Sequence, residues 1–301
     1  MKKKVKLAIA VLILLGTLVA FARYAGSHPA LLRQLKTTSP LIMIVVIGSY
    51  FIGFLALVVI LRVSMRMYDK PISRQENFLL NAYSSLINFF GPGQSGPALR
   101  GLYLKKRHGL GIKKYIFTSL LYYGFYAIIS AFLLLVGSRP WWQTLLLVVA
   151  AGAGSLVIIR WYAKRSKIKD EPGINLTNLG WLFAATALQV AMQTLAFAVE
   201  LRSVQPGISM SQILTYTGAA NFSLFVALTP GAIGIREAFL VFSSNLHHIS
   251  NAVIITANVI DRAMYLVFMG ILFVTVLSLH AKDKLRFKYF TSDANDEKVV
   301  S

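Results

Sequence analysis

The chain has 301 residues, of which 56% are hydrophobic and 14% are charged, and its formal net charge is +20. Soluble domains have about 25% charged residues, so this composition indicates a polytopic membrane protein. The basic residues lie between apolar runs of about 20 residues, which are long enough to span a bilayer, and this argues against a nucleic-acid-binding protein. The absence of cysteine excludes disulfides, thiolate metal sites and a cysteine nucleophile.

Apolar runs along the chain predict an all-α membrane protein with six full transmembrane helices. The first run follows a basic start and resembles a signal peptide, but no clear cleavage site follows it, so we interpret it as a retained span. The predicted spans are Val5–Ala22, Leu41–Leu61, Tyr115–Val136, Gln143–Trp161, Leu179–Val199 and Val253–Leu279.

Two further apolar segments are interrupted, and we predict that each is re-entrant, entering the membrane and returning to the same side. The first, Asn77–Phe90, is too short to span a bilayer and is followed by a basic stretch. The alternative for it is a short full span with a basic external loop. The second descends over Gln212–Leu228 and climbs back over Arg236–Ser244. The breaks contain Pro92, Gly93 and Gly96 in the first segment, and Pro230, Gly231 and Gly234 in the second.

The distribution of basic residues predicts that both termini are cytoplasmic. Of the 31 Lys and Arg residues, 24 fall on the predicted inner side. The first broken segment then enters from inside and the second from outside. The halves, residues 1–136 and 142–280, are therefore expected to be inverted repeats with a site near the membrane midplane. We expect residues 1–280 to form one transmembrane domain and residues 281–301 a polar cytoplasmic tail.

Five charged residues are the candidate lipid headgroup-binding residues: Arg100, Arg236, Glu237, Asp261 and Arg262. Charges at membrane depth are costly unless they are paired or functional, and we expect Asp261 and Arg262 to pair across to Arg236 or Glu237. One interpretation is a structural ion-pair network. The other has Arg100 and Arg236 bind a phosphate, whose oxygens match a guanidinium, with Glu237 and Asp261 as counter-charges or proton acceptors.

Other polar residues are assigned structural or surface roles. Glu200 is expected near the outer surface. His247 and His248 are expected in an outer loop, and no third ligand has metal-binding spacing, so we expect no metal. Interhelical hydrogen bonds are expected for Gln189, Gln193 and Asn221.

The two broken segments resemble the lysylphosphatidylglycerol synthase transmembrane region, or flippase-like, family. The family's P-G-x-x-G-x-R-E signature is matched by Pro230, Gly231, Gly234, Arg236 and Glu237. Its first-half pattern is similar to Asn88, Pro92, Gly96, Arg100 and Leu104, and Arg262 matches an arginine of the last span. Two features depart from the family: Pro97 stands where an acidic residue is common, and Leu120–Tyr123 lacks a Glu-Arg pair.

This resemblance implies translocation of lipid between leaflets by a stand-alone region that lacks the aminoacyl transferase domain of the best-known relatives. We expect the ligand to be a phospholipid or a polyprenyl phosphate, and we expect neither a cofactor nor an enzymatic activity. The retained first span and the basic inner face suit a prokaryotic plasma membrane. One alternative is a membrane-embedded lipid-modifying enzyme that uses Glu237 or Asp261. Another is a non-catalytic partner of a cell-envelope lipid or glycosyl transferase.

Overall fold

The computed structural model describes residues 26, 38–90, 95–136, 140–166, 175–223 and 235–283. These residues form helices and no strand, which confirms the all-α prediction. The helices are α3 (Pro40–Arg66), α4 (Arg74–Phe90), α5 (Ser95–His108), α6 (Ile112–Val136), α7 (Trp141–Ser166), α8 (Leu176–Val204), α9 (Met210–Ser223), α10 (Ile235–Phe242), α11 (Ser244–His247) and α12 (Asn251–Asp283).

In the described part of the chain, four helices are long and apolar enough to cross a bilayer: α3, α6, α8 and α12. They contain the predicted second, third, fifth and sixth spans. The predicted fourth span falls in α7, whose apolar part is the shorter stretch Trp142–Ile158. The predicted first span, Val5–Ala22, lies outside the described residues.

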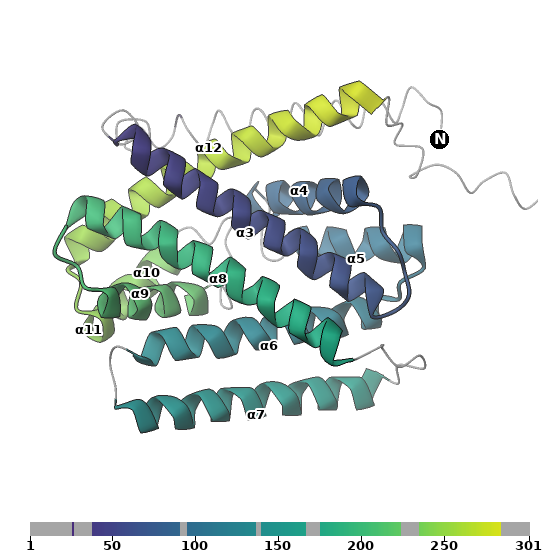
Figure 1. Cartoon of the computed structure of the whole chain (residues 1–301), viewed down its shortest axis with the longest axis horizontal. Coiled ribbons are helices and arrows are strands. Elements are labelled where there is room, and N and C mark those ends of the chain that lie inside the picture. Colours follow the sequence, from purple (N-terminus) through teal and green to yellow (C-terminus); the bar gives the residue numbers. More distant parts are fainter. Residues whose placement is uncertain are drawn as a thin grey trace, which may run out of the picture.

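The helices of the two halves make matching contacts. α3 contacts α4 and α6, as α8 contacts α9 and α12; α5 contacts α4 and α6, as α10 contacts α9 and α12. Across the halves, α6 contacts α8 and α9, as α12 contacts α3 and α4. α3 and α8 pack directly on each other and lie side by side in Figure 1. Exchanging α3 with α8, α4–α5 with α9–α10 and α6 with α12 therefore leaves these contacts unchanged.

The first hairpin consists of α4 and α5, which run antiparallel. Near its tip the amide of Gly96 donates to Asn88 Oδ1 at 3.4 Å, and near its base Tyr103 donates to Glu76 at 2.7 Å. A Cβ on Gly96 would overlap the carbonyl oxygen of Ser84, so this close approach requires glycine. The first arm was predicted as a half-helix, and the structure adds a helical second arm. Basic residues in the last turn of that arm interact favourably with the helix dipole.

The second hairpin, α9 and α10, packs on α6 of the first half. A Cβ on Gly218 would overlap the backbone of Leu134, so α9 and α6 are in backbone contact. Beside this contact Asn221 donates from Nδ2 to Ser130 Oγ at 3.0 Å, which confirms the interhelical role predicted for Asn221. This hairpin is thus held by helices from both halves of the chain.

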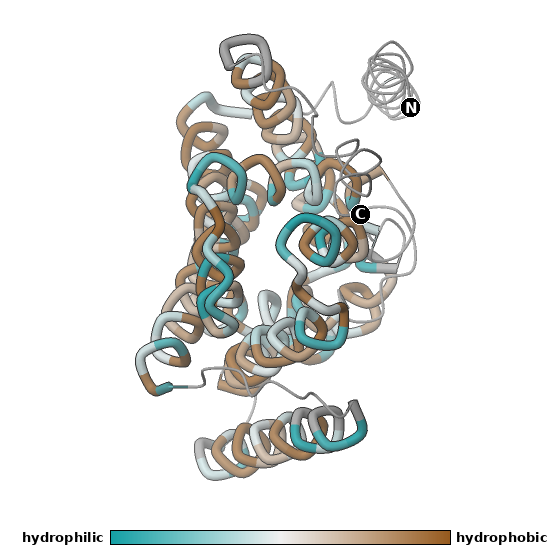
Figure 2. Tube along the Cα trace, turned by 90° about the vertical axis from the view of Figure 1, so that its right-hand side faces the viewer, coloured by the Kyte–Doolittle hydropathy of each residue, from teal (hydrophilic) through white to brown (hydrophobic). Residues whose placement is uncertain are grey.

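α7 lies at the edge of the bundle, at the bottom of Figure 2, and packs on α6. Its exposed side chains are mainly apolar, among them Leu146, Val149 and Val157. An apolar outer face suits contact with lipid acyl chains. The buried core lies instead between α3, α6, α8, α12 and the two hairpins.

Candidate functional site

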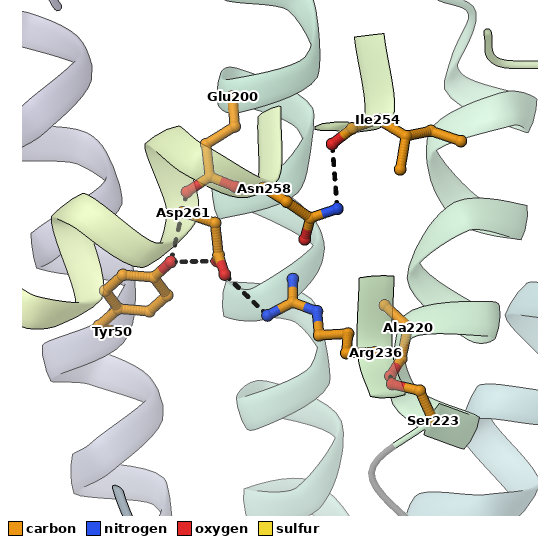
Figure 3. A network of polar contacts seen from close by, with 8 residues as sticks. All are labelled: Tyr50, Glu200, Ala220, Ser223, Arg236, Ile254, Asn258 and Asp261. Atoms are coloured by element: carbon orange, nitrogen blue, oxygen red, sulfur yellow. Dashed lines mark hydrogen bonds and ion pairs between the residues drawn. The ribbon is translucent and has the colours of Figure 1, made fainter. Parts of the chain in front are cut away.

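A buried ion pair joins the second hairpin to α12. Arg236 on α10 donates from Nη1 to Asp261 Oδ2 at 2.7 Å (Figure 3). The two residues are 7% and 4% exposed, and the guanidinium lies 5.0 Å from the centre of the Phe197 ring. One of the predicted cross-pairings, that of Asp261 with Arg236, is therefore confirmed. Its geometry matches what a charge needs when it is removed from water: an opposite charge and a hydrogen bond.

Two residues from other helices extend this pair into a cluster. Tyr50 on α3 lies with its hydroxyl 2.5 Å from Asp261 Oδ1 and 3.3 Å from Glu200 Oε1 (Figure 3). Glu200, on α8, is only 1% exposed. Glu200 was expected near the outer surface of the membrane, and the structure adds that its side chain is buried inside the protein, because α8 continues beyond Val199 to Val204.

The first hairpin presents its arginine in a different setting. Arg100 on α5 is half-buried and donates from Nη2 to Ser84 Oγ of α4 at 3.1 Å. Its Nε is buried without a hydrogen-bond partner among the residues described, and none of their carboxylates forms an ion pair with it. The guanidinium therefore keeps its positive charge uncompensated within the described protein.

A row of tyrosines on α6 lies between the two arginines. Tyr122 lies within electrostatic range of Arg100, and Tyr126 lies within electrostatic range of Arg236. The rings of Tyr122 and Tyr126 are 6.0 Å apart, as expected for a row along one face of a helix. Two hydrogen bonds of 3.1 Å join the row to α8, from Tyr122 to Gln189 and from Tyr126 to Gln193. The interhelical hydrogen bonds predicted for both glutamines are thus confirmed.

The remaining predicted site residues are placed only in part. Glu237 belongs to α10, but its side chain lies outside the described structure, and Arg262 on α12 is 9% exposed. Gly96 is in α5. The other break residues, Pro92, Gly93, Pro230, Gly231 and Gly234, lie outside the described residues. Within the described ranges, no group of three His, Asp or Glu side chains could hold a metal ion.

Neither the contact of Tyr50 with Asp261 nor the burial of Glu200 was predicted from the sequence. A tyrosine in an apolar run is compatible with many environments, so Tyr50 gave no usable signal. Glu200 did give one: an acidic residue directly after an apolar run of spanning length is buried if the helix extends by one more turn.

The comparisons with known proteins identify the family. A sequence profile of the lysylphosphatidylglycerol synthase transmembrane region matches residues 5–272. No curated protein and no solved structure matches the chain. Together with the apolar helices, the match shows a multi-pass membrane protein. The chain belongs to the lysylphosphatidylglycerol synthase transmembrane region family.

Proposed function

We propose that the protein moves a lipid with an anionic or phosphate-containing headgroup between membrane leaflets, and that Arg100 is the first contact of the headgroup phosphate. The observation that carries this proposal is the uncompensated guanidinium of Arg100, whose Nε is buried without an acceptor among the described residues. A buried charge is expensive unless an opposite charge accompanies it. A phosphate would supply both the charge and the acceptor, since its oxygens match the donors of a guanidinium.

The second arginine would meet the phosphate later. Arg236 uses Nη1 for Asp261, while its Nε and Nη2 are buried without partners among the residues described. The tyrosines of α6 and their glutamine partners supply hydroxyl and amide groups between the two arginines. This row would allow a headgroup to exchange one set of polar contacts for another as it passes.

The contact pattern of the helices supports an inverted-repeat arrangement with six full spans and two re-entrant hairpins. In such folds the binding site lies near the midplane, where the broken segments of the two repeats meet. The basic inner face favours cytoplasmic termini and contact with anionic lipid. We propose a prokaryotic plasma membrane as the location. The family name refers to a lysylated phosphatidylglycerol, and such a lipid carries the phosphate that Arg100 would bind.

The test is lipid translocation in proteoliposomes made from the full chain. Fluorescent phosphatidylglycerol and a fluorescent polyprenyl phosphate are each incorporated, and the fraction exposed to an impermeant quencher is followed over time. We expect the wild-type protein to move at least one of them. Arg100→Ala at equal folded protein should fall to the rate of empty vesicles.

A matched control is Lys105→Ala, which removes an exposed positive charge from the same helix. This variant should translocate like the wild type. If Arg100→Ala retained the wild-type rate, or if Lys105→Ala lost it equally, Arg100 would not be the headgroup contact. If the wild type moved neither lipid, with or without a proton gradient, the translocase proposal itself would fail.

A further inference from the structure

The hydroxyl of Tyr50 lies between two buried carboxylates from different helices. Its oxygen is 2.5 Å from Asp261 Oδ1 on α12 and 3.3 Å from Glu200 Oε1 on α8. Glu200 and Asp261 are 1% and 4% exposed. Three helices that are far apart in sequence therefore bring two acids to a single hydroxyl group, as Figure 3 shows.

A phenol has only one hydrogen to donate. The contact of the Tyr50 hydroxyl to Asp261, at 2.5 Å, is much shorter than its contact to Glu200, at 3.3 Å. Asp261 also accepts from Arg236, as an ionised acid would. The hydrogen of Tyr50 therefore belongs to Asp261. The contact with Glu200 then brings together two oxygens, and it is favourable only if Glu200 supplies a hydrogen of its own.

The charges around the cluster lead to the same conclusion. The groups that act on Glu200 are Asp261 from α12, Arg236 from α10 and Tyr50 from α3, and Tyr216 of α9 faces the same cluster. Among the described residues of this cluster, two carboxylates and one guanidinium leave one uncompensated negative charge. Burying that charge would be expensive, whereas a neutral Glu200 leaves the Arg236–Asp261 pair balanced.

We infer that Glu200 is a proton-binding site. Its proton begins a chain of hydrogen bonds that runs from Glu200 to Tyr50 and from Tyr50 to Asp261. One proton from a hydronium ion binds the carboxylate of Glu200 and leaves a water molecule, so one O–H bond breaks and one forms. The new O–H group donates a hydrogen bond to the Tyr50 oxygen. Tyr50 donates to Asp261, and Asp261 also accepts from Arg236. When the proton leaves, Glu200 becomes a second anion that competes for Tyr50 and for the two nitrogens of Arg236 that have no hydrogen-bond partner among the described residues.

Neither the membership of the family nor the proposed headgroup binding specifies a site for a proton. The proton site stands independently of lipid translocation, and only its coupling to transport rests on the proposed function. If transport occurs, release of the proton would change the partners of Arg236. A proton gradient would then bias one state of the second hairpin over the other.

The test is infrared spectroscopy of the full-length protein in dodecyl maltoside, a detergent without carbonyl groups. We expect the wild type at neutral pH to show the carbonyl stretch of a protonated carboxylic acid, shifted by deuterium oxide. Glu200→Gln should abolish this band. Glu76→Gln should retain it, because Glu76 is a partly exposed acid 2.8 Å from His108 and serves as the matched control.

Tyr50→Phe keeps the inference testable if Glu200→Gln does not fold. Without the tyrosine oxygen the protonated acid loses its acceptor, so its band should move to higher frequency but persist. A Glu200→Gln spectrum identical to that of the wild type would overturn the inference. So would loss of the band in Asp261→Asn but not in Glu200→Gln, because the proton would then reside on Asp261.

The coupling of proton binding at Glu200 to lipid translocation is tested separately in the translocation assay. An imposed pH gradient should change the rate of the wild type and leave that of Glu200→Gln unchanged. Equal responses of both proteins would exclude coupling through Glu200. Absence of any translocation would count against the proposed function alone, since the infrared band reports on the proton site directly.

Discussion

The two hairpins have matching positions in the fold but opposite electrostatic settings. Arg236 of the second hairpin has a carboxylate at 2.7 Å, and a second carboxylate, Glu200, belongs to the same cluster. Arg100 of the first hairpin has a hydroxyl at 3.1 Å and a row of tyrosines. Tyr50 contacts Asp261 across α3 and α12, and Gln189 contacts Tyr122 across the exchanged helices α8 and α6. In these matching contacts, α12 therefore contributes an acid, Asp261, whereas α6 contributes a phenol, Tyr122.

This difference separates two roles that the sequence motif alone would give to both arginines. A compensated arginine mainly holds α10 to α12, so its loss should affect folding. An uncompensated arginine contributes little to stability and is available for an anion from outside the protein. Stability and transport measurements on the two hairpins should therefore diverge.

The largest expected effect comes from removing the acid of the second hairpin. Asp261→Ala leaves Arg236 buried without its counter-charge, and this should lower the free energy of unfolding by about 3–5 kcal/mol. Unfolding in detergent micelles titrated with sodium dodecyl sulfate measures the change. Ser84→Ala, which removes the hydrogen-bond partner of Arg100, should cost only about 0.5–1.5 kcal/mol.

The double variant Arg236→Met with Asp261→Leu sharpens this contrast. Replacing a buried ion pair by apolar side chains is often neutral or stabilising, so the double variant should recover most of the stability that Asp261→Ala loses. If it were as unstable as Asp261→Ala, the loss would arise from side-chain packing and not from an unpaired charge.

Part of this arrangement could be predicted from the sequence. The pairing of Arg236 with Asp261 followed from the cost of lone charges at membrane depth, and the helices followed from apolar runs. The electrostatic difference between the hairpins was harder to predict from the sequence. Its only sign in the first half was the lack of an acidic residue at Pro97 and of a Glu-Arg pair at Leu120–Tyr123. The compensating acids of the second half, however, come from α8 and α12, and their approach to Tyr50 depends on helix packing that local sequence does not encode.

Two glycine substitutions test whether both hairpins depend on close packing against a neighbouring backbone. Gly96→Ala and Gly218→Ala each force a methyl group into a neighbouring backbone, so each should cost about 1–3 kcal/mol. Gly48→Ala in α3 is the matched control, because nothing lies within 4 Å of its added Cβ. We expect that control to be neutral or slightly stabilising. If only one of the two hairpin variants lost much stability, close backbone packing would not be a shared requirement of both hairpins.

A smaller effect is expected from the tyrosine row that separates the arginines. Tyr122→Phe and Tyr126→Phe each remove one hydrogen bond to α8, and each should cost about 0.6 kcal/mol, the average for such bonds between membrane helices. The same unfolding titration measures both. If either variant cost several kcal/mol, the row would be a structural clamp and not a set of interchangeable polar contacts.

The smallest effect concerns a histidine at the end of the second hairpin. His247 is buried in α11, its Nε2 lies 3.1 Å from the carbonyl of Leu240, and its Nδ1 accepts from the amide of Ile249. Burial lowers the pKa of His247 below its usual value, so the folded state favours the neutral ring. Stability should be full above about pH 6.5, the ordinary histidine pKa, and should fall as the pH drops through the lower folded-state pKa.

Thermal unfolding of the wild type and of His247→Gln between neutral and mildly acidic pH measures this dependence. The variant should be less stable at neutral pH and should lose less on acidification. A parallel decline of both proteins would assign the acid sensitivity to other groups.

The contact between Ser130 and Asn221 also has a consequence for how the protein is made. The two residues are 91 positions apart in the chain. At a synthesis rate of about 5–20 residues per second, α6 would wait about 5–18 s for α9 to arrive. During that time its small, polar contact surface has no permanent neighbour. We therefore expect the insertion machinery, and not lipid alone, to shelter α6 until the second half emerges from the ribosome.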